Sequence, residues 1–466
     1  MLFSSFSFLF WFLPVTLLLY FLPLLWGRRT LAWQNGVLLV MSLLFYAWGE
    51  PLYLFLMIAT VLADTLFGVL LPRVRHPRAL LLLAVLLHVG LLFYFKYAVF
   101  FAGLLGLSLT APRLPLGISF YTFQALSYVI DVYRKTAEPQ KNPALLGVYV
   151  ALFPQLVAGP IVRYTDVAEA LRSRQHTVGL AAAGTRRFAV GLSKKLLLAN
   201  PMGALFTALV ARGAALSALG ALTALVAFAL QIYFDFSGYS DMAIGLGRIF
   251  GFDFPENFKY PYTARSITDF WRRWHITLSS FFREYVYFPL GGSRRGTWRT
   301  VRNLFVVWSL TGLWHGASWN FILWGVYYFL LLVLEKFVLR RFLPPVSPPF
   351  AHAAALLGIL GGWLIFAFDG STPALTLTAL GGFLRSLFGF GGGFFARAEL
   401  YDIVRHLPLL AIACLGCTPL PRRIYRKTVS KKGRSWLRAA LPLAALLLSV
   451  VELSDAGFNP FLYFRF

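Results

Sequence analysis

Long apolar runs separated by short polar or basic segments make up most of the chain. A helix of about 20 predominantly apolar residues is long enough to cross the hydrocarbon core of a bilayer. Such windows begin near Ser5, Leu31, Pro51, Leu80, Leu114, Leu145, Gly179, Ala215, Val301, Phe321, Ala351, Ala374, Tyr401 and Leu437. Several are interrupted by proline, glycine or charge, so we expect about 10 to 12 true crossings, with re-entrant or interfacial helices elsewhere. The pattern predicts an all-α polytopic membrane protein, folded as a single membrane domain over residues 1–466.

The composition supports this class of protein. Of the 466 residues, 59% are hydrophobic and only 13% are charged, whereas a soluble domain carries about 25% charged residues. The formal net charge is +25. In a membrane protein such an excess anchors the cytoplasmic ends of helices and attracts anionic lipid, so membrane lipids are the expected partners of this charge. The chain has no recognisable nucleic-acid module, and we expect no nucleic-acid partner.

Basic residues also indicate the orientation of the chain. No Lys or Arg precedes Arg28, so positive charge follows the first apolar run. Because cytoplasmic loops carry the excess of Lys and Arg, we expect the N-terminus outside and Arg28–Arg29 in the cytoplasm. The densest basic cluster, also predicted to be cytoplasmic, comprises Arg422, Arg423, Arg426, Lys427, Lys431, Lys432, Arg434 and Arg438. This cluster either orients the protein by charge alone or docks an acidic carrier or donor.

One polar segment interrupts the apolar pattern, between residues 233 and 325. It is richest from Tyr262 to Trp324, which contains His275, His315 and many arginines. Polar side chains are costly in lipid surroundings, so those that are present tend to line a cavity or take part in chemistry. We therefore interpret residues 233–325 as the polar catalytic core of an enzyme whose site lies inside the bilayer.

His315 has the surroundings of a catalytic residue. It lies in the sequence LTGLWHGASWN, where Gly312 and Gly316 remove bulk on both sides of the histidine. Small residues permit either close helix packing or access for a ligand chain. Trp314 supplies a rigid wall, and Asn320 supplies an amide donor and acceptor. Neutral imidazole both takes and gives a proton near pH 7, which suits a general base.

His275 lies in a second polar motif, DFWRRWHITLSSFFREY. If this segment is one helix, Trp271 and His275 share a face at positions i and i+4, while Arg272 and Arg273 point elsewhere. Eight arginines occur from residue 265 to residue 302, against only two acids. Such an excess suits a phosphate or a charged acyl donor. An amphipathic helix lying on anionic lipid explains it equally well.

Other polar residues carry weaker signals. The sequence QIYFDFSGYSDMAIGLG contains Asp235 and Asp241, which fit either a functional role or hydrogen bonding between helices. The chain has no HExxH, nucleophile elbow or P-loop, and no carboxylate–histidine cluster completes a metal site, so we expect no metal. Cys414 and Cys417 lie in an apolar run and are interpreted as packing residues. His88, alone in an apolar helix, is interpreted as a packing residue whose ring finds a hydrogen-bond partner.

Several longer segments resemble a known family. They read FYAWGEPLYL from residue 45, LPLGISFYTFQALSYVIDVYR from residue 114, FPQLVAGPIVRY from residue 153, ENFKYPYTARSITDFWRRWHITLS from residue 256, GLWHGASWNFILWG from residue 312 and NPFLYFRF at the end. With these motifs the chain resembles the membrane-bound O-acyltransferase (MBOAT) family, in particular the bacterial members that acetylate extracellular polysaccharides such as alginate, with the peptidoglycan O-acetyltransferases similar. We recognise no family motif between Phe342 and Phe395.

The resemblance implies a helical fold around a central funnel, in the bacterial inner membrane. It implies that His315 is the catalytic residue and His275 the second marked polar position. The donor would be acetyl-CoA or another acyl thioester on the cytoplasmic side, with no metal or redox cofactor. The implied partners are a polysaccharide acceptor and an exported or membrane-anchored acetyltransferase that completes the transfer.

On this hypothesis, His315 acts as general base on the acceptor hydroxyl. Asn320, or backbone amides near Gly316, stabilise the oxyanion. His275 with Arg272 or Arg273 orients the donor. Three alternatives stay open: a transporter or flippase for a glycan or lipid-linked intermediate, a non-catalytic scaffold for polysaccharide export, and an acyltransferase that acts on lipid or protein.

Overall fold

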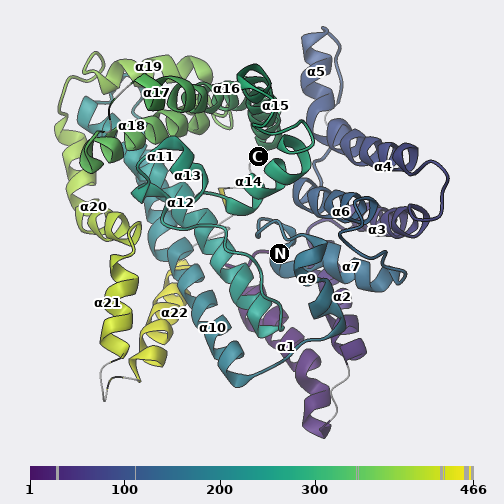
Figure 1. The fold of residues 1–466 in the computed structure, drawn as a ribbon. Coiled ribbons are helices and arrows are strands. Elements are labelled where there is room, and N and C mark those ends of the chain that lie inside the picture. The colour runs from purple at the N-terminus through teal and green to yellow at the C-terminus, as the bar shows by residue number, and fades with distance from the viewer. Residues whose placement is uncertain are drawn as a thin grey trace. The chain divides into compact units, whose positions relative to one another are not determined.

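The computed structural model describes residues 1–27, 31–110, 112–342, 344, 346–430, 434, 436–455 and 461–462. Every regular element among these residues is a helix (Figure 1). The chain divides into two units: Met1–Leu192, Tyr239–Glu256 and Leu453–Pro460 form unit 1, and Ser193–Gly238, Asn257–Glu452 and Phe461–Phe466 form unit 2. The prediction that the protein is an all-α membrane protein is confirmed.

Unit 1 is built from the N-terminal helices. In chain order these are η1 (Ser7–Phe12), α1 (Leu13–Phe21), η2 (Leu22–Trp26), α2 (Leu31–Ala47), α3 (Tyr53–Leu70), α4 (Pro77–Leu92), η3 (Phe93–Tyr97), α5 (Ala98–Leu104), α6 (Ile118–Tyr133), α7 (Pro143–Ala151), α8 (Phe153–Leu156), α9 (Tyr164–Arg172) and α10 (Val178–Ser193). Between α3 and α4, the Nε2 atom of His88 lies 2.9 Å from a carboxylate oxygen of Asp64, and both side chains are fully buried. His88 is therefore a buried packing residue whose ring has a hydrogen-bond partner, as the sequence predicted, and Asp64 on the neighbouring helix is that partner.

Unit 2 contains the polar core and the helices that follow it. Its elements are η4 (Lys194–Ala199), α11 (Asn200–Val210), η5 (Gly213–Ala215), the first part of α12 (Ala218–Ile249), η6 (Pro261–Thr263), α13 (Ile267–Trp271), α14 (Ile276–Phe282), η7 (Arg283–Tyr287), α15 (Thr297–His315), α16 (Trp319–Val333), η8 (Leu334–Leu339), α17 (Arg340–Phe342), α18 (Pro348–Ala367), η9 (Pro373–Leu375), α19 (Leu377–Leu387), α20 (Arg397–Gly416), α21 (Leu420–Val429) and most of α22 (Leu437–Asp455).

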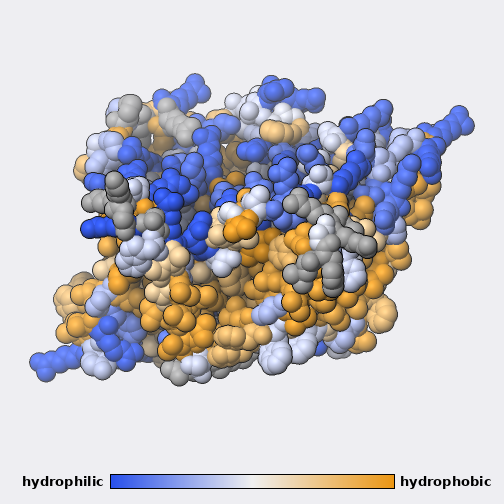
Figure 2. All heavy atoms as spheres, turned by 90° about the horizontal axis from the view of Figure 1, so that it is seen from below, coloured by the Kyte–Doolittle hydropathy of each residue, from blue (hydrophilic) through white to orange (hydrophobic). Residues whose placement is uncertain are grey.

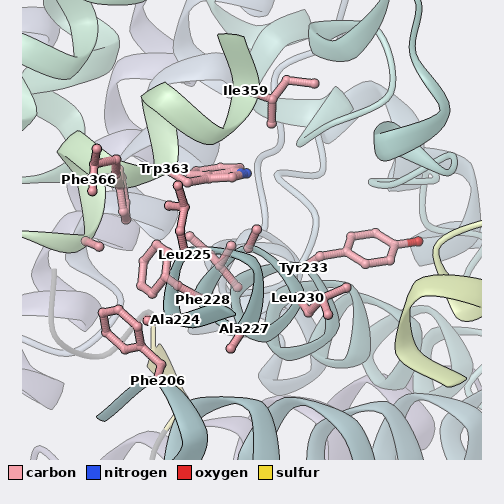
Figure 3. Packing of buried hydrophobic residues seen from close by; sticks show 14 of the residues in the cluster. Phe206, Ala224, Leu225, Ala227, Phe228, Leu230, Tyr233, Ile359, Trp363 and Phe366 are labelled. Carbon is pink, nitrogen blue, oxygen red and sulfur yellow. The ribbon is translucent and has the colours of Figure 1, made fainter. Parts of the chain in front are cut away.

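The hydrophobic core of unit 2 is centred on α12. Buried residues of α12 pack with residues of α11, α16 and α18 in one cluster. Figure 3 shows Trp363 and Phe366, both on α18, facing Leu225 and Phe228 of α12. Each aromatic side chain of this kind buries about 150–250 Å² of its own surface in such packing. This packing fixes the helices that carry the candidate site.

Seven described helical segments are long and apolar enough to cross a membrane. They are Ser7–Leu24, Tyr53–Leu70, Pro77–Leu104, Ala218–Ile249, Trp319–Leu339, Pro348–Ala367 and Leu437–Ser454. The pair α20 and α21, bent by 79°, adds an eighth if it is counted as one span. This is fewer than the 10 to 12 crossings expected from hydropathy, because some windows divide into short helices. The window from Leu145, for example, is divided at Leu152 between α7 and α8.

The surface carries many large apolar side chains. Trp11, Leu52, Phe55 and Leu105 are each more than 70% exposed, and Figure 2 shows hydrophobic residues covering broad continuous areas. Apolar surface of this extent is stable in contact with lipid and not with water. The chain is a multi-pass membrane protein. The predicted cytoplasmic position of Arg28–Arg29 and of Lys431–Lys432 concerns residues outside those described.

Candidate active site

His315 is the last residue of α15 and lines a small cavity in unit 2. The cavity has a volume of about 20 Å³, enough for about one water molecule. Its lining is mostly aromatic and apolar and comprises Ile232, Asp235, Phe236, Trp274, His315, Trp324, Trp363, Phe366 and Leu462. The imidazole is thus neither directed at lipid nor packed solidly on every side. His315 itself is 7% exposed.

A close crossing of α15 and α16 places His315. A Cβ atom on Gly312 would lie 2.5 Å from the carbonyl oxygen of Phe321, and one on Gly325 would lie 2.5 Å from that of Trp308. Neither distance is compatible with a side chain. Of the two roles that the sequence left open for Gly312, the structure supports close helix packing.

Aromatic rings surround the His315 imidazole. Its ring centroid lies 4.9 Å from that of Trp324, 5.1 Å from that of Phe366 and 5.0 Å from that of Trp314. All three contacts are edge-to-face, the arrangement that aromatic rings prefer. Trp314 packs beside the His315 ring but is not among the residues that line the cavity, so its predicted role in the site stays a prediction.

Asp235, on α12, is the carboxylate of the cavity. One of its oxygens lies 2.6 Å from the ammonium nitrogen of Lys195, and the other accepts a hydrogen bond of 2.6 Å from the backbone N–H of Leu462. The Lys195 and Asp235 side chains are each only 4% exposed. Sequence reasoning selected Asp235 but not its partners. The signal for Lys195 was a lysine inside the apolar run that follows Ser193.

His275 lies at a break between two helices. α13 ends at Trp271 and α14 begins at Ile276, and His275 between them has left-handed backbone angles, φ 43° and ψ 54°. The conditional expectation of one helix with Trp271 and His275 on a shared face is therefore wrong. The helix is interrupted because its backbone bonds to the segment Asn257–Lys259 instead. The Arg273 carbonyl accepts a hydrogen bond from Lys259 N–H, and Ile276 N–H donates one to the Asn257 carbonyl.

The two histidines approach the same aromatic side chain. The Trp314 ring lies 5.8 Å from the His275 ring and 5.0 Å from the His315 ring. Phe236, which lines the cavity, lies 4.7 Å from the His275 ring. His275 does not itself line the cavity, so it belongs to the layer of residues behind the cavity wall.

Hydrogen bonds fix the orientation of His275. Its Nδ1 lies 3.1 Å from the side-chain oxygen of Asn257, which also accepts a bond from the Thr277 hydroxyl at 3.0 Å. An amide oxygen is an acceptor, so the proton sits on Nδ1. Complete burial lowers the pKa of His275 to about 3, because desolvation disfavours the charged imidazolium. His275 is therefore neutral at physiological pH and contributes no positive charge toward a phosphate.

The oxyanion candidates lie close to the cavity wall. Asn320 is buried, accepts a hydrogen bond from the Ser318 hydroxyl and donates one of 3.5 Å to the Phe366 carbonyl. Gly316 directly follows His315 with an extended backbone, and a Cβ there would lie 2.6 Å from the Phe321 ring. Asn320 thus contacts Phe366, Gly316 packs against Phe321, and the rings of both phenylalanines lie beside the His315 ring.

The remaining candidates lie away from the cavity. Trp271 packs against Trp308 and Tyr328, with ring centroids 4.6 and 4.8 Å away. Arg272 is exposed, and Arg273 forms an ion pair of 2.8 Å with Asp269. None of the three lines the cavity. Their predicted role in donor binding stays a prediction.

The structure adds cavity residues that the sequence did not single out. Trp363 and Phe366 come from α18, inside the stretch from Phe342 to Phe395 in which no family motif was recognised. Ile232, Trp274 and Leu462 complete the apolar lining. Within the described part of the chain, no group of three or more His, Cys, Asp or Glu side chains is placed to hold a metal ion.

Comparison with known proteins agrees with these motifs. Residues 2–370 match the family described as MBOAT, membrane-bound O-acyltransferase. The chain is 37% identical to the probable alginate O-acetylase of Pseudomonas putida, with 100% of both chains covered. It is 34% identical to the peptidoglycan O-acetyltransferase of Helicobacter pylori, covering 72% of this chain and 70% of the relative. A teichoic acid D-alanyltransferase of Bacillus subtilis is 28% identical over 48% of this chain and 59% of its own length.

The family match, which ends at residue 370, extends over every residue that lines the cavity except Leu462. The full-length relatives cover that end of the chain as well. The chain belongs to the membrane-bound O-acyltransferase family and is an O-acyltransferase.

Proposed function

We propose that this protein takes an acetyl group from a cytoplasmic thioester donor, acetyl-CoA, and passes it across the bacterial inner membrane for O-acetylation of an extracytoplasmic polysaccharide. The observation that carries the proposal is His315 at a cavity walled by Trp324, Trp363 and Phe366. A general base needs a fixed position and a space in which the reacting atoms meet, and the cavity offers both.

The proposed reaction needs only the imidazole, the donor and a hydroxyl. His315 removes the proton from the acceptor hydroxyl, whose oxygen attacks the thioester carbonyl carbon. The tetrahedral intermediate then expels the thiolate of the donor, which receives the proton from the imidazolium. The backbone N–H of Gly316 or the amide of Asn320 is proposed to stabilise the oxyanion, at about 3 kcal/mol per donor.

The acceptor class is proposed from the relatives. The alginate O-acetylases match over the whole of both chains, whereas the peptidoglycan O-acetyltransferase matches about seven tenths of each. This supports an alginate-like exopolysaccharide over peptidoglycan. We further propose that an exported or membrane-anchored acetyltransferase accepts the acetyl group and completes the transfer to the polysaccharide.

The cavity also bears on the alternatives. A transporter needs a passage for its solute, and a lipid or protein acyltransferase that uses long chains needs a deep apolar slot. The cavity beside His315, at about 20 Å³, is by itself neither such a passage nor such a slot. A scaffold would tolerate substitution of His315.

The test is the His315→Ala variant, assayed with radiolabelled acetyl-CoA on inverted membrane vesicles. Removal of a general base is expected to lower acetyl transfer by about 10²- to 10⁴-fold. His406→Ala is the matched control, because His406 lies on α20, bonds to the Asp402 carbonyl and does not line the cavity. Equal amounts of protein in the membrane must be verified. Normal transfer by His315→Ala would reject the proposed role of His315.

A further inference from the structure

Leu462, which together with Phe461 is here called the tail, forms part of the wall of the His315 cavity. Leu462 is far in the sequence from the other lining residues. Those come from α12, α15, α16, α18 and the turn before α14. The backbone N–H of Leu462 donates a hydrogen bond of 2.6 Å to Asp235. A terminal segment is ordinarily poorly ordered unless such contacts hold it.

A buried ion pair anchors this wall. The Lys195 ammonium lies 2.6 Å from one Asp235 oxygen and 4.6 Å from the centroid of the Phe461 ring. Lys195 thus contacts the residue directly before Leu462, while Asp235 bonds to Leu462 itself. Hydrogen bonds to a charged acceptor and cation–π contacts both strengthen when they are shielded from water. Two consecutive residues of the tail are therefore held by one pair of charges.

The same contacts define what Asp235 does. Its two oxygens are occupied, one by the Lys195 ammonium and the other by the Leu462 N–H. Because one oxygen contacts the Lys195 ammonium and the other holds the Leu462 backbone, we assign Asp235 a positioning role for the tail.

We propose that the tail, seated by the Lys195–Asp235 pair, limits the enzyme to short acyl groups, with Leu462 as a specificity-determining residue. The inference rests on the proposed transfer from a thioester. Leu462 closes a cavity whose other walls are rigid indole and phenyl rings of Trp324, Trp363 and Phe366. The cavity of about 20 Å³ has room for about one water molecule, so an acyl group beside His315 has to displace a wall, and the displacement grows with each further methylene.

The first arm of the test measures acyl selectivity. Full-length wild type and Leu462→Ala are supplied with acetyl-, propionyl- and butyryl-CoA, and kcat/KM is determined for each donor. The ratio of butyryl to acetyl transfer is expected to rise at least about 10-fold in Leu462→Ala. The substitution removes three carbon atoms, butyryl exceeds acetyl by two methylenes, and one methylene in an apolar pocket is worth about 10-fold or more. Leu447→Ala is the control, because Leu447 is 58% exposed on α22 and lies away from the cavity.

The second arm tests the anchor without any acyl transfer. Leu462→Cys is made with Cys414→Ser and Cys417→Ser, and the rate of maleimide labelling at position 462 is measured. Adding Asp235→Ala is expected to raise this rate at least about 10-fold, because Leu462 loses its hydrogen bond to the carboxylate and Lys195 loses the ion pair that holds it beside Phe461. Adding Asp235→Asn, which keeps an acceptor for the Leu462 N–H, is expected to raise it less.

The outcomes separate the two proposals. An unchanged donor ratio in Leu462→Ala, or labelling that does not respond to Asp235→Ala, overturns the inference about the tail. If the wild type transfers no acyl group from any CoA thioester, the proposed donor is wrong, and the labelling arm still decides whether Asp235 anchors Leu462. A rise in the ratio together with faster labelling supports the inference.

Discussion

His275 combines an uncommon backbone conformation with complete burial. Non-glycine residues enter the left-handed region at a cost of about 1–2 kcal/mol, and His275 does so with φ 43° while it is 1% exposed. Its Nδ1–H is directed to Asn257, and its Nε2 makes no hydrogen bond within the described part of the chain.

The lowered pKa of His275 predicts a pH dependence of stability. The pKa is about 3 in the folded protein and 6.5 ordinarily, so between these values the unfolded chain binds the proton more readily. Stability is therefore expected to fall as the pH drops below 6.5, by about 1 kcal/mol per pH unit from this residue. The measurement is the unfolding temperature of wild type and His275→Asn in detergent between pH 4.5 and 7.5.

Asparagine is the suitable replacement because it tolerates the left-handed region and does not titrate. Other groups that titrate in this range contribute to both proteins, so the difference between the two curves isolates His275. The variant is expected to show the flatter curve below pH 6.5. Parallel curves would contradict a buried, neutral His275.

At the scale of helices, the crossing of α15 and α16 decides where His315 lies. Both helices present a glycine at the crossing, and each glycine meets the backbone of the other helix. A side chain there collides with a carbonyl oxygen, which cannot rotate away as a flexible side chain can. A displaced α15 would carry its last residue, His315, with it.

Gly312→Ala is therefore expected to destabilise the protein by about 1–3 kcal/mol, the usual cost of overpacking, and to lower acetyl transfer. Gly381→Ala is the matched control, since Gly381 lies inside α19 and a Cβ there meets nothing within 4 Å. The measurements are the unfolding temperature and the transfer rate of both variants. Equal behaviour of the two would show that the crossing tolerates a methyl group.

The sequence predicted the features that depend on local pattern. Apolar windows found helices such as α3 and α18, because hydropathy is a property of a continuous stretch. Small residues beside His315 predicted close packing or access without identifying the partner helix. The break at His275 depends on backbone bonds to Asn257 and Lys259, which no periodicity within the motif reveals.

The site was predictable only in part, because local pattern does not show which distant residues meet in the fold. His315 and Trp314 are adjacent in one motif, so their proximity follows from the chain itself. Asp235, Lys195 and Leu462 are separated by tens to hundreds of residues, and only folding brings them together. Trp363 and Phe366 lie in a stretch without a recognised motif, where an apolar helix gives no sign that one face lines a cavity.

For the whole molecule, charge makes a prediction about topology. The N-terminal span has no Lys or Arg before Arg28, and α21 carries Arg422, Arg423, Arg426 and Lys427. Six of the seven described spans precede α20, and α20 adds a crossing if the bent pair is a span. An odd number of crossings puts the N-terminus and α21 on opposite sides of the membrane, as the distribution of basic residues requires.

Single cysteines at positions 5 and 430, introduced as Ser5→Cys and Ser430→Cys with Cys414→Ser and Cys417→Ser, test this arrangement. A membrane-impermeant maleimide is expected to label position 5 from outside the inner membrane and position 430 only in inverted vesicles. Labelling of both positions from one side means an even number of crossings between them. That result would mean either that the bent pair of α20 and α21 does not cross, which leaves six crossings before it, or that the pair crosses and a shorter helix such as α2 (Leu31–Ala47) crosses as well.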